Sequence, residues 1–247
     1  MLPERTILTI DFGNTAMKAA VFEGERLVQS VVGTGSTHEA VDALQTFHSV
    51  EGICYCCVGA DRENLLEHLR HTGLPMVALG PETPLPIEVC YGSRATLGAD
   101  RLAAAVGVAG EEEAVLVVDA GTAVTCDLVA DRRFLGGNIS PGLKLRFHSL
   151  HEFTSRLPLV SPDGELPVFG HDTQTAIRAG VMNGLVWELA GAFETARSEY
   201  KNIKMVITGG DAAILAPLLA EHGIEAVADS ETVGRGLVRI FNYNNDL

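Results

Sequence analysis

The chain has 247 residues, 47% of them hydrophobic, which is enough for one large domain or two small ones around a sizeable core. Acidic residues outnumber basic ones by 32 to 18, and the formal net charge of −14 argues against a nucleic-acid-binding surface without excluding ATP. The five cysteines have no regular spacing, and we expect neither a signal peptide nor a membrane-spanning run, so a reducing, cytoplasmic compartment is predicted.

The first stretch, Thr6–Lys18, carries a candidate phosphate-binding turn. Ile7–Ile10 alternates like a buried strand that ends on Asp11, and after a tight turn at Gly13 the apolar pattern resumes as a returning strand. A glycine lets the backbone approach an anion, and successive N–H groups near a turn form an anion-binding concavity. Asp11 cannot bind phosphate directly, but it can hold a hydrated Mg²⁺ that does.

Helices and strands then alternate up to the middle of the chain. A strand over Gly52–Gly59 is expected to pair in parallel with the first, and Gly98–Arg101 opens an alanine-rich helix to about Ala109. Pro81–Gly92 holds three prolines and is predicted to be a loop. The other expectations for this half are a helix capped by Thr37, a helix capped by Asp61, a short strand over Met76–Leu79 and a hinge at Glu111–Glu113.

The pattern of strand, acid and glycine occurs a second time. Val115–Val118 is an apolar run that ends on Asp119, Gly121 and Thr122 form the turn, and Val124–Val129 resumes a strand. One such turn is weak evidence because Asp and Gly are common turn residues, but two copies in matching contexts, spaced by close to half the chain, are much stronger. We therefore predict two related domains, residues 1–112 and 113–247, on either side of a nucleotide.

Turn residues and helical periodicity predict the rest of the second half. Gly136–Gly142 is rich in turn residues and should follow a sharp backbone path. Asp172 or Thr173 caps a long helix whose apolar stripe, Ile177–Phe193 with Trp187, is either core or subunit interface. The other expected elements are a helix over about Leu143–Phe153, a loop over Ser161–Gly170, a strand over Lys204–Ile207, a helix after Asp211, a strand over Glu225–Ala228 and a final helix from about Glu231 to Phe241.

Two further stretches have the composition of a ligand site. Thr208–Asp211 joins a strand to a helix, where glycines and a helix N-terminus favour a nucleotide, although a Gly-Gly turn is often only a turn. Asp100 and Arg101 lie at the start of a helix. The helix dipole explains Asp100 alone but not the adjacent cation, so the pair suits substrate handling.

Five motifs, in this order, resemble those of type III pantothenate kinases: Asp11–Thr15, Gly98–Arg101, Asp119–Ala123, Gly136–Gly142 and Thr208–Gly210. The resemblance extends from about Leu8 to Asn242, and the joint occurrence of the motifs is specific although each alone is not. It implies the actin-like ATPase fold, an α/β architecture of two ribonuclease-H-like domains with mixed sheets flanked by helices. It also implies ATP-dependent phosphorylation of pantothenate to 4'-phosphopantothenate, the first step of coenzyme A biosynthesis.

The resemblance implies a role for each matching residue. Asp100 would be the proton acceptor, Asp119 would bind a monovalent cation, K⁺ or NH₄⁺, and Thr173 would reach pantothenate across a homodimer interface. The residues expected at ATP are Asp11, Phe12, Gly13, Asn14, Thr15, Ala16, Met17, Lys18, Thr122, Gly209 and Gly210. Those expected at pantothenate are Tyr91, Gly98, Ala99, Asp100, Arg101 and Thr173.

Two alternatives stay open. One is another kinase of the same superfamily that acts on a sugar or acetate, from which the Gly98–Arg101 motif after Tyr91 distinguishes this chain. The other is a regulatory or accessory protein that binds nucleotide without turnover. The presence of Asp11, Asp100 and Asp119 argues against it.

The apolar character of the predicted helix from Thr173 to about Tyr200 predicts a homodimer.

Overall fold

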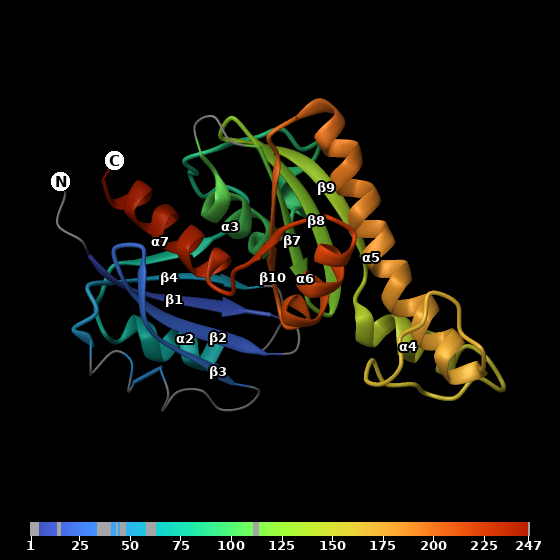
Figure 1. The fold of residues 1–247 in the computed structure, drawn as a ribbon. Coiled ribbons are helices and arrows are strands. Elements are labelled where there is room, and N and C mark those ends of the chain that lie inside the picture. Colours follow the sequence, from blue (N-terminus) through green and yellow to red (C-terminus); the bar gives the residue numbers. More distant parts are fainter. Residues whose placement is uncertain are drawn as a thin grey trace. The chain divides into compact units, whose positions relative to one another are not determined.

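A computed structural model describes residues 5–13, 16–33, 41–42, 44, 48–57, 63–110 and 114–246 (Figure 1). The predicted caps Thr37 and Asp61 and the predicted hinge Glu111–Glu113 lie outside the described residues. The chain forms two compact units: unit 1 comprises Met1–Glu112, Val129–Leu135 and Glu231–Leu247, and unit 2 comprises Glu113–Leu128 and Gly136–Ser230. Among the described residues, no helix is both long enough and apolar enough to span a membrane.

The sheet of unit 1 has the strand order of a ribonuclease-H-like domain. Its five strands lie in the order β3-β2-β1-β4-β5, with β1, β2 and β3 antiparallel and with β4 and β5 parallel to β1. The predicted parallel pairing of the Gly52 strand with the first strand is therefore confirmed. The bounds are β1 Thr6–Phe12, β2 Met17–Glu23, β3 Arg26–Gly33, β4 Gly52–Cys57 and β5 Met76–Leu79.

Alternation along β1 divides its side chains between two faces of this sheet. Leu8, Ile10 and Phe12 belong to a buried cluster that also contains Leu69 of α2, Glu63–Arg70. The opposite face carries Ile7, Thr9 and Asp11. Helix α7, Thr232–Asn245, packs against β1, β4 and helix α3, Ala99–Val108.

Helices α3 and α7 approach each other unusually closely, because glycines lie at their contact. A Cβ on Gly236 would lie 1.8 Å from the carbonyl oxygen of Ala103, and one on Gly107 would lie 2.1 Å from that of Thr232. Glycine is therefore required at both positions for the helix backbones to pack as they do. This packing fixes the start of α3, which carries Asp100, relative to the sheet of unit 1.

The second sheet repeats the strand order of the first when it is read from its other end, with β6 added beside β9. Its strands lie in the order β11-β10-β7-β8-β9-β6, and β10 is parallel to both β7 and β11. The tip of the β8–β9 hairpin belongs to unit 1, where β6 pairs with β9 at Arg133 and Phe134. The bounds are β6 Glu88–Val89, β7 Ala114–Ala120, β8 Ala123–Ala130, β9 Arg133–Pro141, β10 Lys204–Thr208 and β11 Ala226–Ala228.

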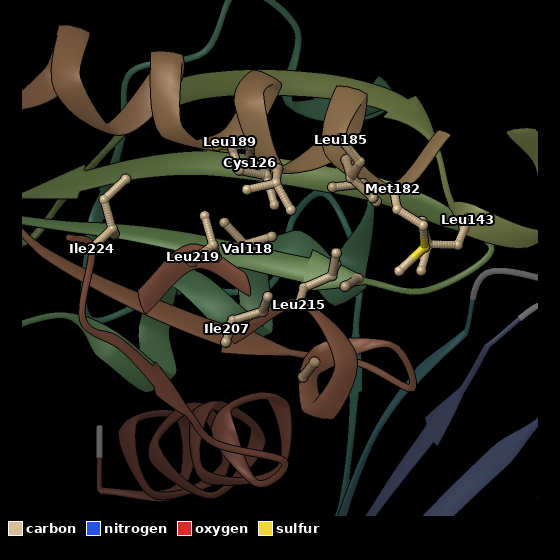
Figure 2. Packing of buried hydrophobic residues seen from close by; sticks show 14 of the residues in the cluster. Val118, Cys126, Leu143, Met182, Leu185, Leu189, Ile207, Leu215, Leu219 and Ile224 are labelled. Atoms are coloured by element: carbon tan, nitrogen blue, oxygen red, sulfur yellow. The ribbon is translucent and has the colours of Figure 1, made fainter. Parts of the chain in front are cut away.

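The core of unit 2 lies between its sheet and two helices, α5, Thr173–Glu199, and α6, Ala212–Glu221. Figure 2 shows side chains from α5, from α6 and from the strands meeting in one cluster, including Leu185, Leu215 and Val118. Two further helices are a 3₁₀ turn at Arg94–Thr96 and α4 at Leu143–Glu152. The predicted cap at Asp172 is confirmed, because its carboxylate accepts the backbone N–H of Thr175 at 2.8 Å in a capping box.

Four expectations about these elements need correction. Gly136–Gly142 does not form a sharp turn, because all but its last residue lies in β9, where a Cβ on Gly137 would lie 2.1 Å from the Asp127 carboxylate. The glycine there therefore serves close strand packing. The predicted loop at Pro81–Gly92 contains the short strand β6, since Glu88 and Val89 pair with β9.

The third correction concerns the final helix, which the predicted boundary after residue 112 assigned to the second half. Helix α7 belongs to unit 1, because its apolar face covers β1 and β4. The fourth concerns Trp187, which we expect to pack with the apolar stripe of α5 but which is 46% exposed. The stripe itself lies in unit 2's own core, one of its two predicted places, with these buried members: Ile177, Val181, Leu185, Leu189 and Phe193.

Candidate functional site

In unit 1, Asp11 lies at the end of β1 between two polar neighbours of the sheet. The strand register places Lys18 of β2 opposite it on one side and Cys56 of β4 opposite it on the other. After Asp11 the backbone N–H of Gly13 donates to the carbonyl of Ala16 at 3.1 Å and closes the turn. Phe12 and Met17 are buried beside this turn, while Asn14 and Thr15 lie outside the described residues.

The thiol of Cys56 connects two of the predicted site residues. Its Sγ donates a hydrogen bond to Oδ1 of Asp11 at 3.2 Å. Complete burial raises the pKa of the Cys56 thiol well above its usual value, and the negative charges of Asp11 and Asp100 add to that effect. Helix α3, whose first turn carries Asp100, packs against β4, the strand of Cys56, so the two predicted carboxylates lie on elements that meet at β4.

Lys18 forms an ion pair within unit 1. Its ammonium lies 2.9 Å from Oε1 of Glu231, the residue that immediately precedes α7, and both side chains are largely shielded from solvent. The pair joins the second strand of the phosphate-binding turn to the start of the last helix.

The start of α3 explains why glycine precedes Asp100. The Asp100 carboxylate accepts the backbone N–H of Arg101 at 2.8 Å, and a Cβ on Gly98 would lie 2.4 Å from that carboxylate oxygen. Gly98 caps the helix, and Ala99 is its first residue. The short side chains at these two positions leave the Asp100 carboxylate partly exposed at the helix N-terminus.

Arg101 is buried against aromatic rings. Only 5% of its surface is exposed, and its guanidinium lies 5.7 Å from the Tyr91 ring centroid and 5.6 Å from that of Phe134. Tyr91 and Phe134 pack edge to face at 5.8 Å. Cation–π contact of this kind helps to fix the guanidinium and orients Tyr91, which stays 36% exposed.

In unit 2, the motif residues that follow β7 and β10 come together. Gly142 donates its N–H to the carbonyl of Thr122 at 3.0 Å, and Asp211 donates its N–H to that of Ala120 at 3.0 Å. Gly209 has a φ of +91°, and a Cβ there would lie 2.5 Å from Oδ1 of Asp119. Gly209 and Gly142 therefore bring backbone without side chains close to the end of β7.

A cavity of about 390 Å³ lies beside this cluster. It is mostly apolar, with Asp211 at its edge, where burial raises the pKa of the carboxyl while a hydrogen bond from the Leu143 backbone N–H opposes that rise. A cavity of this size and lining suits a flat apolar group with a few polar edges. Its lining residues are Leu143, Lys144, Phe147, His148, Leu159, Val160, Ser161, Pro162 and Asp211.

Thr173 stands apart from both clusters along the chain. It is the first residue of α5, directly after the Asp172 cap, and it is exposed. The described residues contain no group of three or more His, Cys, Asp or Glu side chains that could hold a metal ion by themselves.

Sequence reasoning missed Cys56 and Glu231. In the sequence, Cys56 resembles any other apolar residue of a strand. Only the register of β4 against β1 reveals that it lies opposite Asp11. The predicted parallel pairing could have raised the question, since the last residues of two parallel strands share an edge. Glu231 gave no signal, because its ion pair with Lys18 joins residues far apart in the sequence.

Comparison with known proteins gives consistent results. The sequence profile of the type III pantothenate kinase family matches residues 7–195. Type III pantothenate kinase from Bacteroides fragilis is 37% identical over 243 residues, covering 96% of this chain and 98% of the relative, and that from Porphyromonas gingivalis is 38% identical with the same coverage.

Solved structures agree on the fold. A protein from Campylobacter jejuni, described in connection with the Baf family of transcriptional activators, superposes with a TM-score of 0.64 at 26% identity, covering 97% of this chain and 100% of that one. A ROK family glucokinase from Streptomyces griseus, in complex with glucose and AMPPNP, gives a TM-score of 0.51 at 12% identity, with 98% and 100% covered. Both sheets therefore belong to the actin-like fold.

Proposed function

Because the chain belongs to the type III pantothenate kinase family, we propose that it transfers the γ-phosphoryl group of ATP to the primary hydroxyl of pantothenate, the first step of coenzyme A biosynthesis. The observation that carries this proposal is the clustering in unit 1. Asp11, at the phosphate-binding turn, accepts a hydrogen bond from Cys56 of β4, and α3, whose first turn carries Asp100, packs against the same strand. A phosphate-handling group and a candidate general base in one region are what transfer to a hydroxyl requires.

Turns with little side-chain cover supply the residues that are proposed to bind ATP. In unit 1 these are the residues from Asp11 to Lys18, and in unit 2 they are Thr122 and the Gly209–Gly210 turn. The support is that Gly209 and Gly142 allow backbone to pack closely around the end of β7. The adjacent apolar cavity is proposed to take the purine, which needs stacking surface and a few polar edges.

Pantothenate is proposed to lie at the start of α3, in contact with Tyr91, Gly98, Ala99, Asp100 and Arg101. Asp100 accepts the hydroxyl proton as the hydroxyl oxygen bonds to the γ-phosphorus and the bond from that phosphorus to the β,γ-bridging oxygen breaks. Arg101, held over two rings, supplies a fixed positive charge for the pantothenate carboxylate. Positioning and charge neutralisation carry most of the rate in such transfers.

Two cations are proposed. Asp11 fits Mg²⁺, because a single partly exposed carboxylate beside a phosphate-binding turn is a typical protein contribution to a Mg²⁺ that phosphates and water otherwise complete. Asp119 is proposed to bind K⁺ or NH₄⁺ near the Gly209 turn. When bound, these ions neutralise charge on the phosphates.

The assembly is proposed to be a cytoplasmic homodimer with Thr173 facing the partner's pantothenate. The buried stripe of α5 no longer supports this. The support comes instead from exposed apolar side chains on α4, on α5 and between them, including Phe153, Phe169 and Trp187 at 88%, 84% and 46% exposure. Free, buried cysteines such as Cys54 and Cys126 suit a reducing compartment.

A second candidate is a nucleotide-binding regulator without turnover, which the description of the Campylobacter jejuni relative favours. A coupled assay with ATP, Mg²⁺ and pantothenate separates the two. We expect turnover that requires pantothenate and increases when K⁺ or NH₄⁺ replaces Na⁺. Nucleotide binding without pantothenate-dependent turnover would favour the regulator, and turnover with a sugar or acetate instead would identify a related kinase.

A further inference from the structure

Three polar residues form one row across the sheet of unit 1. Lys18 of β2, Asp11 of β1 and Cys56 of β4 are paired in register, so their side chains project from the same face. Lys18 is held by Glu231 at one end of the row, and α3, the helix that carries Asp100, packs against β4 at the other. Asp11 therefore has a cation on one side and a neutral hydrogen-bond donor on the other.

The thiol is built into this position. Cys56 is fully buried, at 0% exposure, and its Sγ lies 3.2 Å from Oδ1 of Asp11. A buried cysteine is ordinarily a small apolar residue, and Cys54, also at 0% exposure two residues earlier, shows that ordinary case because it lies opposite Thr9. The two cysteines share a strand, a face and a degree of burial, but only one lies opposite a carboxylate.

We propose that Cys56 is a positioning residue for Asp11: its thiol proton fixes Oδ1, and so sets the orientation in which the carboxylate meets the hydrated Mg²⁺ of the nucleotide. The proposal rests on the proposed function for the identity of that ligand. Positioning residues of this kind act through the carboxylate that they orient and do not touch substrate.

The chemistry favours a neutral donor here. A second lysine would neutralise the Asp11 carboxylate, and another carboxylate would repel it, so either would change the charge available to a cation. A thiol donates one hydrogen bond and leaves the charge of Asp11 unchanged. A hydroxyl would do the same, which predicts that serine can replace Cys56.

The test is calorimetric titration of the full chain with AMP-PNP, a non-hydrolysable ATP analogue, with Mg²⁺ and separately in EDTA. Cys56→Ala and Cys56→Val remove the donor, Cys56→Ser keeps one, and Cys54→Ala is the matched control for a lost buried thiol. Thermal unfolding of each variant confirms folding. If one donor-free variant fails to fold, the other provides the comparison.

We expect Cys56→Ala and Cys56→Val to bind Mg²⁺·AMP-PNP about tenfold more weakly than the wild type. Loss of a hydrogen-bond partner of a metal-binding carboxylate typically weakens binding by about 10- to 100-fold, and a thiol is a weak donor, so we expect the smaller effect. Cys54→Ala and Cys56→Ser should bind like the wild type, and in EDTA all variants should match it. The proposal is overturned if the donor-free variants behave like Cys54→Ala, lose the same affinity in EDTA, or are not rescued by serine. If the proposed function is wrong, the wild type would bind AMP-PNP but would show no pantothenate-dependent turnover in the coupled assay.

Discussion

At the scale of single residues, Asp100 is the group on which turnover should depend most. It lies at the start of α3 with a partly exposed carboxylate that one backbone N–H orients. Asp100→Asn keeps the shape and the acceptor but loses the base, so turnover should fall by about 10²- to 10⁴-fold while AMP-PNP binding is retained. Steady-state kinetics and calorimetry measure the two. Asp131→Asn at the exposed β8–β9 tip is the control, and near wild-type turnover in Asp100→Asn would remove this residue from the mechanism.

Gly209 should be irreplaceable for a local steric reason. Its φ is +91°, and a Cβ would lie 2.5 Å from both the Ala120 carbonyl and the Asp119 carboxylate, whereas a Cβ on Gly210 would meet nothing within 4 Å. Gly209→Ala should therefore lower the free energy of unfolding by about 1–3 kcal/mol, and Gly210→Ala by much less. Chemical denaturation compares the two. Equal losses would mean that the backbone at Gly209 relaxes freely.

The positions of two candidate site residues at strand ends could be predicted because the repeat is visible in the sequence. Asp11 and Asp119 each end an apolar strand and precede a glycine, and the structure has both where expected. Their neighbours across the sheet could not be predicted, since Cys56 and Lys18 meet Asp11 only through strand register. Register depends on pairing between distant segments, which local pattern does not report.

At the scale of elements, α7 is the helix whose loss unit 1 should tolerate least. Phe241 is 2% exposed, and its ring fills the space above Gly52 of β4, where a Cβ would lie 2.0 Å from the ring. Phe241→Ala should lower the free energy of unfolding by about 3–5 kcal/mol because it leaves a cavity. Tyr243→Ala, on the exposed side of the same helix, is the control. Denaturant unfolding of both variants gives the difference, and equal effects would contradict the packing described.

Elements with strong periodicity or caps could be predicted, and those made by distant partners could not. Helix α5 begins at its Asp172 cap as expected. The glycines of β9 suggested a turn, but they instead make room for Asp127 and the backbone of Cys126 on the neighbouring strand. Strand β6 pairs with β9, and the three prolines in the segment just before it hide it in the sequence.

At the scale of the whole molecule, activity should depend on association between chains. Phe169 is 84% exposed between α4 and α5, which is unusual for a phenylalanine that no partner covers. Phe169→Ser should shift the protein from dimer to monomer in sedimentation and lower turnover per chain, whereas Val227→Ser, an exposed apolar residue of β11, should do neither. A wild-type chain that is an active monomer at assay concentration would contradict both the dimer and the shared site.

The order of the segments in unit 1 has a consequence for biosynthesis. Its sheet is made before unit 2, and α7 is made after it. The N-terminus of a chain leaves the ribosome first, so β1 and β4 emerge long before the helix that covers them. Unit 2 can fold while the chain is still tethered, but the sheet of unit 1 keeps an apolar face open to chaperones and proteases until α7 has left the ribosome. Ribosome-bound chains that lack the final helix should therefore be cleaved preferentially in unit 1.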